Sequence, residues 1–147
     1  MLLSDVIIVL SRPAEAGNVG AVCRAMKNMG ISRLRLVSPE FGCGENEGII
    51  QARAIHAAEL WEKAETYKTL KEAVKDCTLI IGTTRRRGRH RKQITMTPDE
   101  TAAFLAGHPG QAALVFGNER TGLEDDELEL CNFASHIPVD ESFPSLN

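Results

Sequence analysis

The sequence predicts an α/β fold, in which a mainly parallel β-sheet carries helices on both of its faces. Short apolar runs rich in Val, Ile, Leu and Phe alternate along the chain with longer amphipathic segments. A strand, a helix and a second strand in succession form a right-handed crossover, which makes the strands parallel and covers the sheet. Because 147 residues is the length of one ordinary domain, we expect residues 1–147 to form a single domain.

The strands and helices can be assigned in order. The expected strands are DVIIVL (5–10), RLRLV (33–37), CTLIIG (77–82), AALVFG (112–117) and FASHIPV (133–139). The expected helices cover residues 18–29, 48–57, 70–75, 98–105 and 125–131. Residues 40–47 are expected to form a glycine-rich loop.

The first expected helix has two distinct faces. Asn18 is a residue type suited to cap its amino terminus. Apolar side chains follow at helical spacing on one face: Val19, Val22, Cys23, Met26 and Met29. At about 100° per residue, Arg24 lies roughly 140° from Val19 and therefore points away from that face.

Charge is distributed unevenly along the chain. Six of the 17 Lys and Arg residues lie between Arg85 and Lys92, which leaves 11 against 20 Asp and Glu residues elsewhere. A cationic segment on an acidic body is either a solvated loop or a contact site for a polyanion. The cationic residues are Arg85, Arg86, Arg87, Arg89, Arg91 and Lys92.

Composition excludes several other classes of protein. The chain has no apolar run of about 18 residues and no signal peptide, so we expect a cytoplasmic protein without a membrane span. The four cysteines and four histidines are scattered, so we expect reduced thiols and no bound metal. The glycines after the first strand lack the GxGxxG spacing and no GxxxxGK[ST] occurs, which weakens an NAD enzyme and a P-loop NTPase.

The segments that follow the strands are where a ligand is expected, because ligands of open parallel sheets bind at the carboxyl ends of the strands. These segments are SRPAEAGNVG, TTRRRGRHRK, GNERTGL and PVDESFPSLN. Taken singly, each has a plain structural explanation. Asn18 would only cap a helix while Arg24 is solvated, and GNERTGL would be a turn that leaves Glu119 exposed. Ser145 and Asn147 would only begin a further helix.

Occurring together and in this order, three of these segments resemble the motifs of the SPOUT class of methyltransferases, in its SpoU or TrmH branch of RNA ribose 2'-O-methyltransferases. Motif one is similar to GNVGAVCRAMKNMG, motif two to LVFGNERTGL and motif three to IPVDESFPSLN. The opening residues, together with TLKEAVKDCTLIIGTTRR, resemble the TrmJ group, which modifies the tRNA anticodon loop.

The resemblance implies a carboxyl-terminal trefoil knot, S-adenosyl-L-methionine as cofactor, no metal, and a homodimer whose active site is completed across the interface. Family members continue motif three into a helix that threads the knot, so we expect this helix and any carboxyl-terminal extension to be missing from residues 1–147. Either the native chain continues past Asn147 or the knot and the pocket are incomplete. The resemblance assigns cofactor binding to Gly82, Thr83, Thr84, Gly117, Asn118, Ile137, Ser145 and Leu146.

The resemblance also implies the reaction and its residues. It gives the central catalytic role to Arg24, supported by Asn18, Glu119, Ser145 and Asn147. A guanidinium has a pKa above about 12, so a role in which Arg24 keeps its charge and stabilises the ribose alkoxide is chemically easier than a role as base. The implied substrate is tRNA, at cytidine or uridine 32 of the anticodon loop. The cationic residues from Arg85 to Lys92 are expected to bind its phosphates. The alternatives are rRNA methylation and a non-catalytic RNA-binding module on the same fold.

Overall fold

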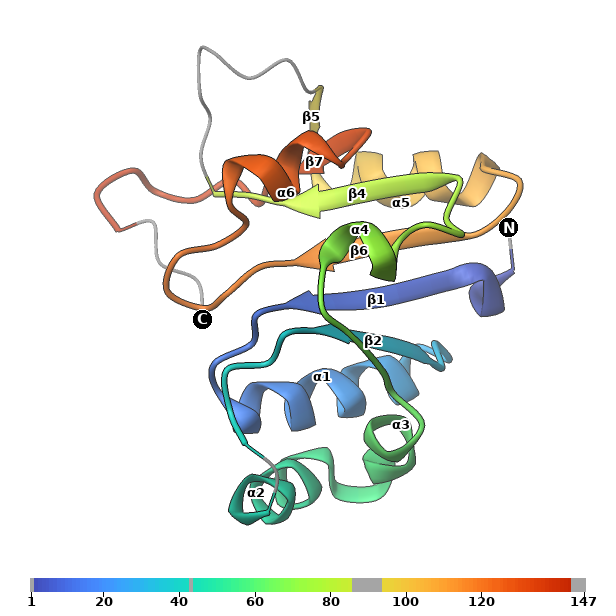
Figure 1. Cartoon of the computed structure of the whole chain (residues 1–147). Helices are drawn as coiled ribbons and strands as arrows, with labels where there is room; N and C mark the ends of the chain where they lie inside the picture. The colour runs from blue at the N-terminus through green and yellow to red at the C-terminus, as the bar shows by residue number, and fades with distance from the viewer. Residues whose placement is uncertain (1, 43, 86–93, 144–147) are drawn as a thin grey trace.

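The computed structural model describes residues 2–42, 44–85 and 94–143, and its centre is a β-sheet. The strands are β1 (Val6–Ser11), β2 (Arg33–Val37), β3 (Glu65–Tyr67), β4 (Leu79–Thr83), β5 (Thr95–Met96), β6 (Ala112–Phe116) and β7 (Phe133–Ser135). They are ordered β3-β2-β1-β6-β4-β7-β5, and every adjacent pair is parallel (Figure 1). The predicted parallel α/β sheet is therefore confirmed.

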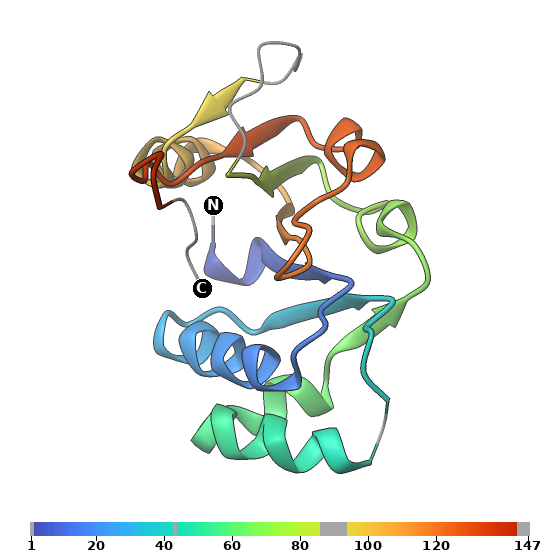
Figure 2. The same cartoon turned by 90° about the vertical axis from the view of Figure 1, so that its left-hand side faces the viewer.

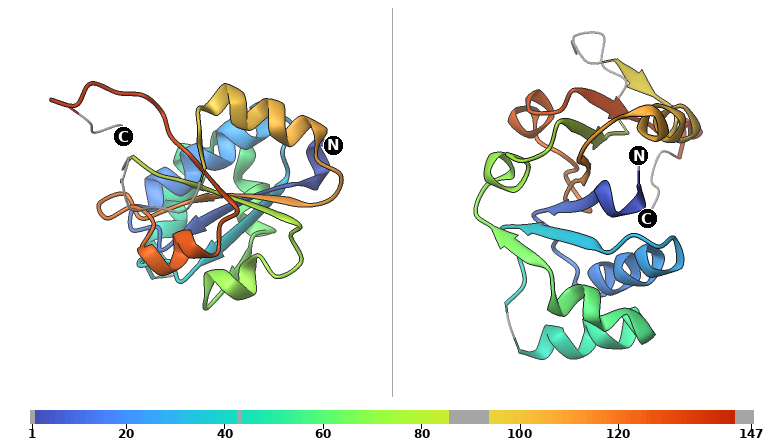
Figure 3. Two further views of the ribbon diagram at one scale, coloured as in Figure 1. Left: turned by 90° about the horizontal axis from the view of Figure 1, so that it is seen from above. Right: turned by 90° about the vertical axis from the view of Figure 1, so that its right-hand side faces the viewer.

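Helices cover both faces of this sheet. They are α1 (Ala16–Asn28), α2 (Glu45–Ala54), α3 (Ala58–Glu62), α4 (Leu70–Ala73), α5 (Pro98–Gly107) and α6 (Asp125–Glu129), with 3-10 turns η1 (Leu3–Asp5) and η2 (Ile55–Ala57). Seen from above, α1 and α5 lie on one face, and α4 and α6 lie on the other (Figure 3). The α2 helix packs on the outer side of α1 (Figure 2).

Alternation along β1 explains the two-sided core. Val6, Ile8 and Leu10 pack with α1 and α2 on one face. Ile7 and Val9 pack with α4 and with the segment around α6 on the other. Successive side chains of a strand point to opposite faces, so a strand covered on both sides reads as the uninterrupted apolar run seen in the sequence.

The packing of α2 on α1 depends on Gly20. A Cβ atom at this position would lie 2.4 Å from the carbonyl oxygen of Ile50 and 2.7 Å from Cβ of Arg53. The absence of a side chain therefore lets the two helices approach closely.

Two short edge strands and one helix were not expected from the sequence. The β3 and β5 segments, ETY and TM, are too short and too polar to give an apolar signal, and their pairing with β2 and β7 places them in the sheet. A single helix ending at residue 57 was expected in this region, but the chain forms a further helix, α3, immediately after it. The expected loop at residues 40–47 is shorter, because α2 begins at Glu45.

Two expectations about α1 were wrong. The cap position is Glu15 rather than Asn18, and Asn18 lies inside the helix, where its side chain has another partner. Val19, Cys23 and Met26 are buried as expected, but Met29 is exposed because the helix ends at Asn28.

Among the described residues, no helix is both long enough and apolar enough to cross a membrane. Residues 144–147, the end of the motif that is expected to lead into the knot, lie outside the described part of the chain.

Candidate functional site

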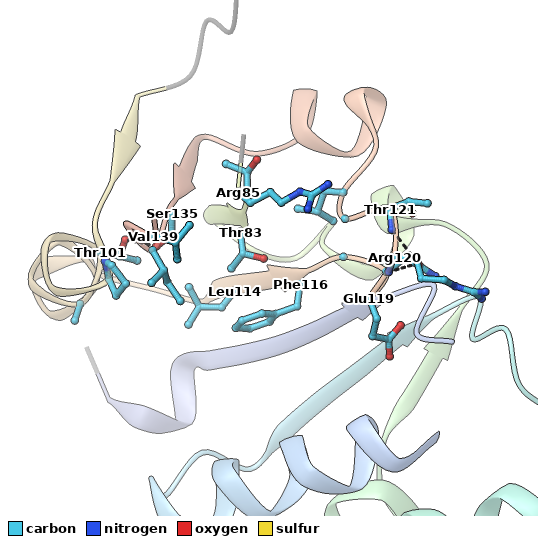
Figure 4. Close-up of a pocket in the computed structure, with 18 of the residues that line it drawn as sticks. Thr83, Arg85, Thr101, Leu114, Phe116, Glu119, Arg120, Thr121, Ser135 and Val139 are labelled. Atoms are coloured by element: carbon cyan, nitrogen blue, oxygen red, sulfur yellow. Dashed lines mark hydrogen bonds between the residues drawn. The ribbon is translucent and has the colours of Figure 1, made fainter. Parts of the chain in front are cut away.

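A pocket of about 490 Å³ lies at the carboxyl ends of β4, β6 and β7, the edge of the sheet where a ligand was expected (Figure 4). Its apolar wall includes Leu105, Leu114, Phe116, Ile137 and Val139. Its polar lining includes Thr83, Thr84, Thr101 and Ser135. Pockets of this size, mainly apolar with a few polar groups, are typical of sites for small organic ligands.

Most of the residues predicted to bind a cofactor border this pocket. Thr83, Thr84, Gly117, Asn118 and Ile137 line it. The remaining three do not contribute in the same way. Gly82 lies one residue back in β4, where an added Cβ would meet Cys131 Sγ at 2.8 Å, so its role is to let α6 approach the sheet. Ser145 and Leu146 lie outside the described residues.

The segment from Gly117 to Gly122, here named the pocket loop, closes tightly on itself. A Cβ on Gly117 would lie 2.3 Å from the backbone carbon of Gly122, and Gly122 has a left-handed φ of 70°. The amide of Gly122 donates to the carbonyl of Asn118 over 2.8 Å. The two glycines therefore permit a turn that residues with side chains would strain.

The buried side chain of Asn118 holds this loop in place. Its Oδ1 accepts hydrogen bonds from the amides of Arg120 (2.9 Å) and Thr121 (3.2 Å). Its Nδ2 donates to the carbonyl of Arg12, just after β1, over 2.8 Å. The side chain of Asn118 is thus engaged with the backbone, and a bound ligand would meet mainly the backbone of this loop.

Glu119 joins the pocket loop to the start of α1. Its carboxylate accepts from the amides of Ala14 (2.9 Å) and Glu15 (3.2 Å) and from Nδ2 of Asn18 (3.1 Å). Partial burial alone would raise the pKa of Glu119, but these hydrogen bonds outweigh burial and hold the pKa below its usual value. Two predicted site residues, Asn18 and Glu119, are therefore in direct contact although 101 positions separate them.

Arg24 lies on α1 away from this contact. Its side chain is exposed, as the helical spacing predicted, and it is not part of the pocket lining. The carboxylate of Glu119 is occupied by Ala14, Glu15 and Asn18. Within the described residues the structure does not bring Arg24 and Glu119 together.

An ionic cluster beside the pocket loop was missed by the sequence reasoning. The guanidinium of Arg12 donates from Nη2 to Glu127 Oε2 (2.9 Å) and to the carbonyl of Gly122 (3.0 Å). The other Glu127 oxygen accepts from the buried Ser11 hydroxyl. Burial would raise the pKa of Glu127, but hydrogen bonds from Arg12 and Ser11 outweigh burial and lower it. The hydrogen bond to Glu127 raises the pKa of Arg12.

The sequence held only an incomplete signal for this cluster. Ser11 and Arg12 open the segment SRPAEAGNVG at a strand end, which was identified as a place for a ligand. Glu127 sits at the third position of α6, where it also caps the helix by accepting from the amide of Glu124 (2.7 Å). Neither position shows that the two side chains meet.

Of the cationic segment, the structure places Arg85 alone. Arg85 lines the pocket, and its residue is exposed (Figure 4). The other five cationic residues, Arg86, Arg87, Arg89, Arg91 and Lys92, lie outside the described residues, as does the predicted catalytic Asn147. No group of three or more His, Cys, Asp or Glu side chains in the described ranges could hold a metal ion.

The chain is similar to known proteins along nearly its whole length. Residues 5–147 match the model of the SpoU rRNA Methylase family. The chain is 40% identical over 149 residues to the tRNA (cytidine/uridine/adenosine-2'-O-)-methyltransferase TrmJ of Pseudomonas aeruginosa, a match that covers 99% of this chain and 56% of that protein. The chain thus spans little more than half the length of this relative.

Solved structures agree with this match. TrmJ from Z. mobilis ZM4 is 35% identical, with a TM-score of 0.89, and the alignment covers 96% of this chain and 62% of that chain. The SpoU methyltransferase AviRb from Streptomyces viridochromogenes, solved in complex with the cofactor AdoMet, has a TM-score of 0.69 at 18% identity over 98% of this chain and 55% of its own. At that identity the likeness is one of fold.

Proposed function

Because this chain belongs to the SpoU methylase family, we propose that it transfers the methyl group of S-adenosylmethionine to a ribose 2'-hydroxyl of RNA. The observation that carries the proposal is the contact between Glu119, at the pocket, and the residues that open α1, the helix of Arg24. This contact links the pocket for a small organic ligand to the helix that carries the predicted catalytic arginine.

The pocket suits S-adenosylmethionine in size and in chemistry. Leu114, Phe116 and Ile137 offer apolar surface for an adenine ring, and the hydroxyls of Thr83 and Ser135 offer hydrogen bonds to a ribose. The tight turn between Gly117 and Gly122 presents backbone groups at the pocket edge. When bound, the cofactor supplies a methyl group that its sulfonium already activates, so the reaction needs no metal.

The residues of the chain would serve the ribose. A ribose hydroxyl is a weak nucleophile, so the protein has to place it in line with the methyl group and stabilise the negative charge that develops on oxygen. Arg24 can do this with its charge retained, by holding a neighbouring phosphate and the developing alkoxide. Asn18 and Glu119 would fix the start of α1, the helix that carries Arg24, on the body of its own chain.

Arg24 lies outside the pocket of its own chain, which favours a homodimer whose active site combines the pocket of one copy with α1 of the other. Such an arrangement predicts complementation between two inactive variants. In Gly117→Val the added side chain would clash with the backbone of Gly122 and distort the pocket loop. Mixing this variant with Arg24→Ala should restore activity that neither variant has alone. Continued inactivity of the mixture would favour a site formed within one chain.

The proposed substrate is tRNA, at a cytidine or uridine of the anticodon loop. The name of the Pseudomonas relative gives tRNA and cytidine, uridine or adenosine, and the resemblance of the motifs to the TrmJ group supports the anticodon loop. Arg85 at the pocket and the five cations that follow it would bind RNA phosphates beside the methyl donor. Neutralising all six should weaken tRNA binding and reduce its salt dependence, while the affinity for cofactor stays unchanged.

Calorimetry and labelled methyl transfer test the proposal. S-adenosylhomocysteine should bind and NAD should not. Transfer of labelled methyl to bulk tRNA should exceed transfer to rRNA, and nucleoside mapping would locate the modified ribose.

The Arg24→Ala variant should lose at least about 100-fold in turnover and keep its affinity for S-adenosylhomocysteine. The matched control is Lys27→Ala, one turn further along α1. Full activity of Arg24→Ala would contradict the role of Arg24, and RNA binding without cofactor binding would indicate a non-catalytic module.

A further inference from the structure

Arg12 occupies an unusual position directly after β1. Its φ is 51°, in the left-handed region that residues with side chains rarely adopt. Its amide donates to the carbonyl of Val37 over 2.7 Å, which continues the β1–β2 pairing by one residue. Its carbonyl turns toward the pocket loop and accepts from Nδ2 of Asn118. The strained backbone thus allows Arg12 to bond to β2 and to the pocket loop at the same time.

The side chain of Arg12 contacts the other end of the same loop. Nη2 donates to the carbonyl of Gly122, while Asn118 holds the backbone of Arg12. Gly122 and Asn118 are also bonded to each other. Arg12, Asn118 and Gly122 therefore form a closed ring of hydrogen bonds around the base of the pocket loop.

Glu127 fixes the orientation of the guanidinium in this ring. It receives Nη2 of Arg12 at 2.9 Å and Nε at 3.4 Å, and the Glu124 carboxylate lies 3.4 Å from Nη1. The side chains of Arg12 and Glu127 are only 21% and 10% exposed, so solvent screens this pair less than a surface pair. Arg12 itself is not among the residues that line the pocket.

We propose that Arg12 is a positioning residue of the cofactor site, which holds the pocket loop, through Gly122 and Asn118, in the conformation that binds the cofactor. This inference rests on the proposed function for the identity of the ligand. It assigns to Arg12 an effect on affinity that is exerted through the loop, without contact with the cofactor.

The test uses two variants and a matched control. Arg12→Gln removes the charge and the fork of donors, whereas Arg12→Lys keeps the charge but cannot reproduce the planar fork between Glu127 and Gly122. The control is Arg33→Gln. Arg33 is the first residue of β2, at the end of the strands away from the pocket loop, and its guanidinium donates to Gln111 Oε1 over 2.8 Å. Arg12→Lys also serves if Arg12→Gln does not fold.

Titration calorimetry with S-adenosylhomocysteine should show a dissociation constant about tenfold higher for Arg12→Gln, in keeping with the loss of one charge-assisted hydrogen bond. Arg12→Lys should fall between Arg12→Gln and the wild type, and Arg33→Gln should match the wild type. The KM for S-adenosylmethionine should rise with little change in kcat. Unchanged affinity in both Arg12 variants would overturn the proposal.

Hydrogen exchange of the ligand-free protein separates positioning from general stability. In the Arg12 variants the amides of Arg120, Thr121 and Gly122 should exchange faster, while those of β1 and β6 keep their wild-type protection. Uniformly faster exchange across the sheet, with affinity retained, would show that Arg12 is only structural. If the wild type binds no S-adenosylhomocysteine, the proposed function fails, and the exchange measurement still decides whether Arg12 orders the loop.

Discussion

Two arginines near adjacent strands, Arg12 after β1 and Arg35 within β2, are both held by carboxylates but stabilise different parts of the molecule. The guanidinium of Arg35 binds Asp76 through two hydrogen bonds of 2.6 and 2.8 Å and donates to the carbonyl of Ala73, the last residue of α4. The guanidinium of Arg12 binds Glu127 and the pocket loop.

The two arginines differ in the groups that their side chains contact. Arg35 is 3% exposed and lies 5.6 Å from the centre of the Tyr67 ring. Its guanidinium contacts Asp76, the carbonyl of Ala73 and, at 3.6 Å, Glu65, and none of these residues lines the pocket. Arg12 reaches groups whose backbone borders the pocket. The same ion-pair chemistry therefore serves packing in one place and the shape of the site in the other.

Removing Arg35 should have the largest effect on stability. In Arg35→Ala, Asp76 and the carbonyl of Ala73 lose their partner and a large side chain leaves the core, so we expect a loss of about 3 kcal/mol in the free energy of unfolding. Urea denaturation measures this loss, with Arg33→Ala, two residues earlier on β2, as the milder control. S-adenosylhomocysteine affinity should not change. A tenfold loss of affinity would mean that the two clusters are coupled.

Replacing Glu127 should affect both properties, because this residue caps α6 and also orients Arg12. In Glu127→Gln, part of the carboxylate's acceptor capacity is lost and Arg12 is left beside an amide, so we expect a loss of about 2 kcal/mol together with weaker cofactor binding. The control is Glu129→Gln, on the exposed side of the same helix. If Glu127→Gln unfolds at the wild-type urea concentration, the cluster does not contribute to stability.

The fold was largely predictable because its central strands are covered on both faces and are therefore rich in apolar residues. Segments such as RLRLV and AALVFG are apolar enough to be identified from the sequence alone, and both were observed as strands with bounds within one residue of those expected. The edge strands β3 and β5 were not predictable, since their few polar residues adopt strand geometry only by pairing with a neighbour.

The site was predictable as a place but not as a set of contacts. The rule that ligands bind at the carboxyl ends of parallel strands located the pocket, and the motifs named Glu119, which lines the pocket, and Asn18, which contacts Glu119. Arg12 and Glu127 are 115 positions apart, and their contact depends on β6 lying next to β1 and on the path of the chain from β6 to α6. No short segment of sequence encodes that arrangement.

Acid should weaken the Arg35 cluster within a defined range of pH. The hydrogen bond from Arg35 lowers the pKa of Asp76 from its ordinary 3.8 to about 2. A depressed carboxylate pKa gives stability that is complete above the unfolded pKa and is lost as the pH falls toward the folded pKa, here between about pH 4 and pH 2. The effect should be smaller than that of Arg35→Ala, because the Asp76 side chain is 41% exposed and solvent screens it.

Urea denaturation at a series of pH values measures this dependence. Asp76→Asn should lose the part of the acid dependence that falls between pH 4 and pH 2, while Glu62→Gln, which replaces an exposed carboxylate at the end of α3, should keep it. Identical pH profiles for the wild type and Asp76→Asn would show that the Arg35 cluster gains nothing from the charge of Asp76.

The smallest effect should come from an ion pair that belongs to neither cluster. Lys27 on α1 lies 2.9 Å from Glu59 on α3, with both side chains about half exposed, and Lys27 also donates to the carbonyl of His56 over 2.7 Å. In Glu59→Gln, Lys27 keeps its hydrogen bond to the carbonyl of His56, and water solvates the ammonium group that has lost its carboxylate partner. The urea midpoint should therefore not shift resolvably. A shift as large as that of Glu127→Gln would mean that burial does not distinguish the ion pairs of this fold. The different effects expected of Arg12 and Arg35 would then need an explanation other than the different groups that they contact.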